Sequence, residues 1–159
     1  MQLFVVRHAA AEGSEPGAAG AARELTEAGK TKLRRAVRGL AALEVRFERI
    51  LTSPWKRAAQ TARLLEAVAN GPAITTELLA KPPSTELLAL IAERGDPNAV
   101  VGHEPWLGEL VAWLAFGDAR HGEALPIKKA GVLWLGGTAV PGGMQLRASI
   151  PPKLLRALG

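Results

Sequence analysis

The stretch Leu-Phe-Val-Val-Arg-His, residues 3–8, decides the fold that we expect for this chain. Its run of apolar residues is typical of a strand that is buried on both faces, as in a mostly parallel sheet. The run ends abruptly at Arg7 and His8, which places two polar side chains at the carboxyl end of the strand. Ligands of open α/β sheets bind beyond these ends, so this dipeptide is the first candidate for a functional site.

The rest of the chain alternates between strand and helix patterns. A loop of small residues, 9–22, leads to a helix that Thr26 is expected to cap. The other strands are predicted at 49–52, 73–76, 98–101, 132–135 and 144–150, and helices at 27–41, 53–70, 84–94, 105–116 and the C-terminus. Four strand-to-helix passages predict an α/β fold, a three-layer α/β/α sandwich with a mostly parallel central sheet, in a single domain of residues 1–159.

Composition excludes several kinds of chemistry. The 159 residues include no cysteine, which excludes disulfides, thiolate catalysis and cysteine-based zinc sites. We find no export signal at the start, and the longest strongly apolar run, 110–116, is far shorter than the roughly 20 residues that cross a bilayer. We therefore expect a cytoplasmic protein without membrane contact.

A net charge of +5 favours anionic partners, either nucleic acid or phosphorylated molecules.

Two further strand ends carry basic side chains. Arg57 is expected in or near the first turn of the helix that Ser53 caps, after the second strand, and His103 directly follows the fourth strand. A parallel sheet places both along one edge with Arg7 and His8. Guanidinium groups match phosphoryl oxygens in charge and geometry, and a neutral imidazole can attack phosphorus. We therefore predict a phosphate site with His8 as the nucleophile.

Four ordered motifs carry a family resemblance. They are Val-Val-Arg-His-Ala at 5–9, Leu-Thr-Glu-Ala-Gly at 25–29, Thr-Ser-Pro-Trp-Lys-Arg-Ala-Ala-Gln-Thr-Ala at 52–62 and Val-Gly-His-Glu-Pro at 101–105. The chain resembles the histidine phosphatase superfamily, whose fold is phosphoglycerate mutase-like, and within it the SixA branch of phosphohistidine phosphatases. The match spans roughly residues 1–110, and Ala9 replaces the glycine that usually follows Arg-His.

The resemblance implies a role for each matching residue. His8 becomes transiently phosphorylated, Arg7 and Arg57 bind the phosphoryl oxygens, and His103 donates a hydrogen bond to them. Arg23 resembles an arginine that lies near the pocket in the short branch and is a candidate substrate-binding residue. No metal or other cofactor is implied.

The general acid is poorly specified. Phosphomonoester-cleaving relatives carry a carboxylate after the third strand, where Glu77 is a candidate and Lys81 and Glu86 are nearby. A phosphoramidate nitrogen is easier to displace than an alkoxide, and the chain has no room for a cap over a small substrate.

The expected partner is thus a protein that bears phosphohistidine, possibly a histidine-phosphotransfer domain. A small phosphate ester, cleaved or transferred by a phosphomonoesterase or mutase-like enzyme, is the alternative. The oligomeric state stays open and is compatible with a monomer.

Other classes of protein fit the sequence less well. A nucleic-acid-binding module is disfavoured because 4% of residues are aromatic and no recognised binding motif is present. The histidines lack the spacing of metal ligands, and His121 is expected to be a solvated loop residue.

Trp106 and Trp113 share a helix face and are expected in the core. Trp55 either lines the pocket or, preferably, packs in the core.

Overall fold

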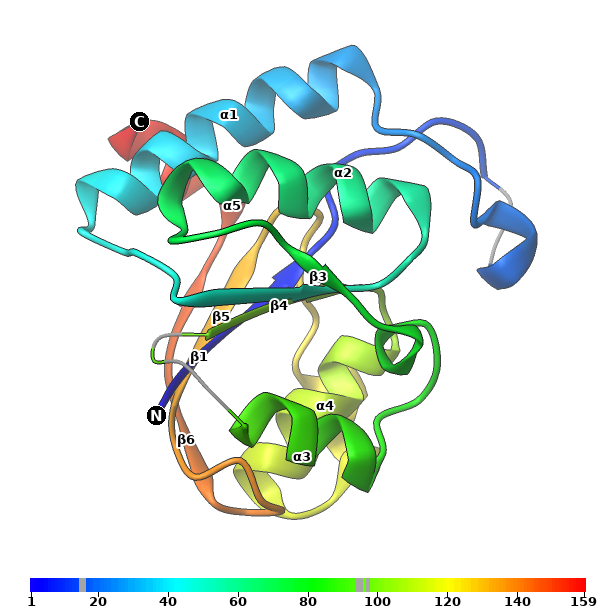
Figure 1. Ribbon diagram of the computed structural model, residues 1–159, viewed down its shortest axis with the longest axis vertical. Coiled ribbons are helices and arrows are strands. Elements are labelled where there is room, and N and C mark those ends of the chain that lie inside the picture. Colours follow the sequence, from blue (N-terminus) through cyan, green and yellow to red (C-terminus); the bar gives the residue numbers. More distant parts are fainter. Residues whose placement is uncertain (15–16, 94–95, 97) are drawn as a thin grey trace.

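Figure 1 presents the computed structural model, which describes residues 1–14, 17–93, 96 and 98–159. Within these residues, six strands form one sheet in the order β3-β2-β4-β1-β5-β6. Their bounds are β1 Gln2–Arg7, β2 Arg49–Thr52, β3 Ile74–Thr75, β4 Asn98–Gly102, β5 Val132–Gly137 and β6 Met144–Ile150. Each lies where the sequence predicted a strand.

The sheet is mostly parallel, as predicted. Strands β3, β2, β4 and β1 run parallel to their neighbours, whereas β5 is antiparallel to both β1 and β6. Only β5 therefore runs against the other described strands. Arg7 pairs with Gly102, and Thr52 pairs with Val101, so β1, β4 and β2 end side by side. The polar residues that follow these ends are brought to one edge.

Helices cover both faces of the sheet, which confirms the three-layer sandwich. The helices are α1 Glu27–Ala42, α2 Lys56–Leu65, α3 Thr85–Ala92, α4 Trp106–Phe116 and α5 Pro152–Leu158, with short 3-10 helices η1 Gly17–Gly20, η2 Glu66–Val68, η3 Glu77–Leu79 and η4 Ala119–Ala124. In Figure 1, α1, α2 and α5 lie on one face, and α3 and α4 on the other. No helix in the described part of the chain has the length and apolar composition needed to cross a membrane.

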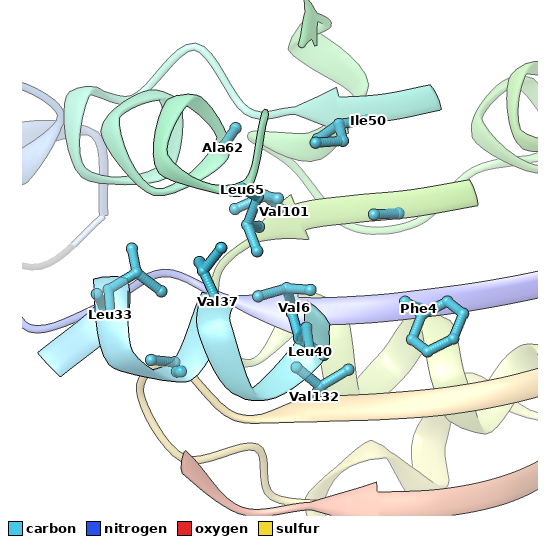
Figure 2. Close-up of a cluster of buried hydrophobic side chains, with 14 of the residues drawn as sticks. Phe4, Val6, Leu33, Val37, Leu40, Ile50, Ala62, Leu65, Val101 and Val132 are labelled. Atoms are coloured by element: carbon cyan, nitrogen blue, oxygen red, sulfur yellow. The ribbon is translucent and has the colours of Figure 1, made fainter. Parts of the chain in front are cut away.

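Alternation along β1 divides the core into two halves. Phe4 and Val6 join the cluster under α1 and α2, while Leu3 and Val5 join the cluster under α3 and α4. Figure 2 shows members of the first cluster: Phe4, Val6, Leu33, Val37, Leu40, Ile50, Ala62, Leu65, Val101 and Val132. Burial of one such side chain as large as valine or bigger contributes about 1.5–3 kcal/mol. The core thus holds the central strands, and with them the site edge, in a fixed arrangement.

The predicted cap of α1 is confirmed. The Thr26 hydroxyl accepts a hydrogen bond from the Gly29 N–H at 2.8 Å. Helix α3 begins at Thr85, one residue after the predicted start, and Ser84 is its N-cap. The helix ends at Ala92, and the predicted end near residue 94 lies outside the described residues.

The predicted start of α2 is wrong. The helix begins at Lys56, and its N-cap, Trp55, makes no side-chain capping bond. The Ser53 hydroxyl accepts from the Trp55 N–H at 3.2 Å and also bonds the imidazole of His103, so it serves the turn before the helix. The helix also stops at Leu65, short of the predicted residue 70. Arg57 is nevertheless in the first turn, as expected.

Candidate active site

His8 lies at the carboxyl end of β1 and is held there by main-chain bonds. Its N–H donates to the Gly102 carbonyl at 3.1 Å, and its carbonyl accepts from the Ala130 N–H at 3.2 Å. The side chain is 4% exposed. The next residue, Ala9, is also buried, and its N–H donates to the Thr61 hydroxyl of α2 at 3.0 Å. Its φ is not among the positive values of the described residues, so alanine in place of glycine is accommodated here.

The hydrogen bonds of His8 identify its tautomer. Nδ1 lies 2.7 Å from the Ala9 carbonyl oxygen, which can only accept, so Nδ1 carries the proton. Nε2 then presents its lone pair, and the Nε–H of Arg57 donates to it at 3.2 Å. Nε2 is therefore the nitrogen available for attack on phosphorus.

The surroundings of His8 keep the imidazole neutral. Burial lowers the pKa of His8 from 6.5 to about 4; the bond to the Ala9 carbonyl opposes this shift, and the charges of Arg57, Arg7 and Lys129 add to it. A neutral ring is the reactive form of a histidine nucleophile. At neutral pH, His8 is thus in the form that can act as a nucleophile.

Arg57 connects α2 to His8. It is 4% exposed, and its Nη1–H donates to the Gly20 carbonyl at 2.7 Å. Its guanidinium also lies 4.8 Å from the ring centroid of Trp55. Burial, followed by the charges of Arg23 and Arg7, lowers the pKa of Arg57 to about 10, so the group stays cationic at neutral pH.

Arg7, Arg23 and Arg57 form what we call the arginine cluster, and each is oriented by a main-chain carbonyl. Nη1 of Arg7 donates to Ile127 at 2.8 Å, and Nη1 of Arg23 donates to Gly13 at 3.1 Å. The Nε atoms of Arg7 and Arg23 are buried without a protein partner. Among the described residues, no carboxylate forms an ion pair with the cluster. Its positive charge is thus available to an anion.

His103 directly follows β4 and lies beside His8, with 5.3 Å between the ring centroids. Its Nε2 is 2.8 Å from the Ser53 hydroxyl, and its Nδ1 is buried without a protein partner. Burial, then the charges of Arg57, His8, Arg7 and Arg23, lowers the pKa of His103 from 6.5 to about 3. Both site histidines are therefore neutral at physiological pH.

Two tryptophans flank His103 and correct an expectation. The ring of Trp55 lies 4.4 Å from the His103 ring and 5.6 Å from that of Trp106, centroid to centroid. Trp55 and Trp106 are both only partly buried. Trp106, predicted in the core together with Trp113, instead contacts the site because it opens α4 directly after the His103 turn. Trp113 is partly buried against the second core cluster.

Residues 127–131, which precede β5, also reach the site, although the sequence pattern gave no prediction for them. Because β5 is antiparallel to β1, its beginning meets the end of β1. The Ala130 N–H donates to the carbonyls of both Arg7 and His8, and the charge of Lys129 acts on His8. The one signal in the sequence was the pair of basic residues, Lys128 and Lys129, just before the predicted strand.

The candidate acids lie at the surface. Glu77 opens η3, just after β3, and its side chain is exposed; its role as acid or base stays a prediction. A hydrogen bond from Ser84 lowers the pKa of Glu86, which is the opposite of what a proton donor near neutral pH needs. Lys81 is exposed, and so is His121, as expected for a solvated loop residue. In the described part of the chain, no three His, Asp or Glu residues are grouped as metal ligands.

Three arginines and two neutral histidines at the carboxyl edge of a mostly parallel sheet define a site for phosphoryl chemistry. Residues 3–81 match the histidine phosphatase superfamily (branch 1). An uncharacterized protein of Picosynechococcus sp. (strain ATCC 27264 / PCC 7002 / PR-6) is 38% identical over an alignment of 142 residues, and the match covers 85% of this chain and 84% of that protein. The chain belongs to the histidine phosphatase superfamily and is a phosphatase of the SixA type.

Solved structures agree with this assignment. The protein histidine phosphatase SixA, in complex with tungstate, superposes with a TM-score of 0.78 at 28% identity, over 98% of this chain and 99% of that one. The alpha-ribazole phosphatase of Shigella flexneri has a TM-score of 0.75 at 16% identity, over 96% and 97% of the two chains, and shares the fold. The predicted phosphoglycerate mutase-like architecture is thereby confirmed.

The lowered histidine pKa values make a prediction about pH. In an NMR titration of the imidazole Cε1 protons, we expect His8 to titrate near pH 4 and His103 near pH 3, with assignments from His8→Asn and His103→Asn variants. Both pKa values lie below 6.5 because burial disfavours the charged ring, so each imidazole gains its second proton only at a lower pH. His8 should therefore stay neutral as the pH falls from 7 to about 5. A His8 midpoint near 6.5 would contradict this account.

Proposed function

We propose that this phosphatase hydrolyses phosphohistidine on a protein through a covalent phospho-His8 intermediate. The observation that carries the proposal is the unprotonated Nε2 of His8, directed by the Ala9 carbonyl and placed beside the arginine cluster. A tetrahedral dianion fits a site with this charge, and the SixA structure contains tungstate, a tetrahedral oxyanion.

The reaction has two displacements at phosphorus. Nε2 of His8 attacks, a new N–P bond forms, and the N–P bond of the substrate breaks, so the substrate histidine leaves. If its other ring nitrogen carries a proton, the histidine leaves as neutral imidazole and needs no proton donor. A water then attacks phospho-His8, the N–P bond breaks, and phosphate departs with the protons of that water. Neutral His8 is restored.

The remaining site residues stabilise the transferring group in this proposal. Arg7 and Arg57 bind the equatorial oxygens, where charge gathers in the transition state. His103 contributes through Nδ1: the Ser53 hydroxyl donates to Nε2, which leaves Nδ1–H as a donor toward the phosphoryl group. Arg23 adds charge at the rim and binds the incoming substrate.

Phosphohistidine is favoured over a phosphate ester by the position of the acids. Ester cleavage expels an alkoxide, which needs a proton from a nearby carboxylic acid. Glu77, the candidate for that role, is exposed to solvent after β3. A small phosphate ester remains the second candidate because Glu77 lies after a strand end of the same sheet.

A substrate comparison tests the proposal. The protein is offered a phosphorylated histidine-phosphotransfer domain and, in parallel, phosphoserine, a phosphoglycerate and para-nitrophenyl phosphate. We expect kcat/KM for the phosphohistidine protein to exceed that for phosphoserine and for the phosphoglycerate by at least about tenfold, because its leaving group needs no acid. The para-nitrophenolate leaving group needs none either, so para-nitrophenyl phosphate serves as the control ester. Rapid turnover of an ester with the phosphohistidine protein left intact would exclude this substrate. A Glu77→Gln variant that loses only ester activity would identify the acid of the second candidate.

A further inference from the structure

Glu104 follows His103 but turns its carboxylate toward two backbone N–H groups. Oε1 accepts from the Ile127 N–H at 2.8 Å, and Oε2 accepts from the Gly108 N–H in the first turn of α4 at 2.9 Å. The carbonyl of Ile127 in turn accepts the Nη1–H of Arg7 at 2.8 Å. One carboxylate thus connects the β4–α4 turn to the carbonyl that orients a guanidinium of the arginine cluster.

We propose that Glu104 is a positioning residue for Arg7, acting through the backbone of Ile127. The inference rests on the proposed function because it takes Arg7 as a ligand of the phosphoryl oxygens. Glu104 itself touches neither Arg7 nor substrate in this proposal. It fixes the height and direction of the Ile127 carbonyl, and that carbonyl fixes which N–H groups of Arg7 face the anion.

The segment that Glu104 bonds, residues 127–131, also makes hydrogen bonds to the main chain of Arg7. The Arg7 N–H donates to the Gly131 carbonyl at 3.2 Å, and the Arg7 carbonyl accepts from the Ala130 N–H at 3.0 Å. Residues 127–131 therefore bond Arg7 at both its main chain and its side chain. Hydrogen bonds to a carboxylate are about twice as strong as neutral ones. The Glu104 bond is thus a strong attachment for the end of this segment that orients the guanidinium.

Close packing of two glycines supports the same connection. A Cβ on Gly108 would lie 2.7 Å from the Gly122 carbonyl oxygen and 3.2 Å from Oε2 of Glu104. A Cβ on Gly122 would lie 2.6 Å from the Glu109 nitrogen. Helix η4 therefore rests directly on the first turn of α4. Because η4 packs against α4, the chain that follows η4 brings Ile127 close to the start of α4. The Glu104 carboxylate can therefore bond the N–H groups of both Ile127 and Gly108.

A neighbouring acid provides a matched control. Glu123 and Glu104 line the same cavity of about 470 Å³ beside Arg7. Glu123 is exposed at the surface, and none of the hydrogen bonds described here involves its carboxylate. Removing the charge of Glu123 changes the field around Arg7 and leaves the Ile127 bond intact. The pair Glu104→Gln and Glu123→Gln thus separates positioning from simple electrostatics.

The experiment measures tungstate affinity by calorimetry in a double-mutant cycle. Glutamine at 104 keeps one carbonyl acceptor but turns an amide toward the second N–H. We expect Glu104→Gln to raise the Kd for tungstate about tenfold, as for other residues that orient a ligand indirectly, and Glu123→Gln to change it less than about twofold. In an Arg7→Ala background, Glu104→Gln should have almost no further effect, because the two residues act as one unit.

The outcomes distinguish this inference from the function on which it rests. If Arg7→Ala leaves tungstate binding unchanged, the proposed phosphate site is wrong. If Arg7→Ala weakens binding and Glu104→Gln lowers only the thermal midpoint, or acts equally with and without Arg7, Glu104 has a structural role and the inference fails. Should Glu104→Gln not fold, Glu104→Asp keeps the charge, shortens the reach to Ile127 and supplies the same comparison.

Discussion

Replacing His8 with alanine is expected to lower kcat for dephosphorylation by at least about a thousandfold, because it removes the imidazole that forms the covalent intermediate in the proposed mechanism. The variant should still bind tungstate, since the arginine cluster and its carbonyl partners are untouched. Single-turnover kinetics, with mass spectrometry of the enzyme quenched at alkaline pH, should detect one added phosphoryl group in the wild type and none in His8→Ala.

The matched control is His121→Ala, which removes an exposed histidine of the η4 region. It should turn over at the wild-type rate and carry the same phosphoryl group. Substantial activity in His8→Ala, or a phosphorylated enzyme without His8, would overturn the mechanism.

Arg57→Ala is expected to cost about 10²–10³ in kcat, with a smaller change in KM. At rest, the Arg57 Nε–H bonds the lone pair of His8 Nε2. That bond is lost when Nε2 forms its bond to phosphorus, while the guanidinium gains the charged oxygens of the transition state. The interaction therefore strengthens mainly in the transition state and affects kcat. Steady-state kinetics of Arg57→Ala and Arg57→Lys give both constants.

Arg63→Ala is the appropriate comparison because Arg63 lies on the same helix, α2, and is exposed. It should leave kcat and KM unchanged. Lysine at 57 should restore little activity, since it lacks the fork that reaches Nε2 and the Gly20 carbonyl together. An Arg57→Ala variant that changes KM alone would contradict a transition-state role.

The sequence was sufficient to predict the strand ends and the residues that follow them. An apolar run that stops at Arg7 and His8 needs only the rule for parallel sheets to bring it beside His103. Arg57 was predictable because a strand-to-helix passage places the first helical turn at the same edge. These predictions depend on short-range patterns, which a single sequence contains.

Contacts between distant segments were not predictable in the same way. Ser53 reads as an N-cap, yet its hydroxyl serves His103, which lies 50 residues further along the chain. Trp106 shares a helix face with Trp113, and the orientation of α4, not its periodicity, determines that Trp106 reaches the site. The antiparallel direction of β5, which delivers Lys129, depends on how the last strands add to the sheet.

The three carbonyls that orient the arginine cluster belong to Gly13, Gly20 and Ile127. Every amino acid has a carbonyl, so a point substitution at these positions cannot delete the acceptor itself. An insertion or deletion in the loop that contains Gly13 and Gly20, or in residues 127–131, shifts the acceptor by a whole residue. The guanidinium that it orients then points in a different direction. For engineering this phosphatase, loop length near the site is therefore a more sensitive variable than loop composition.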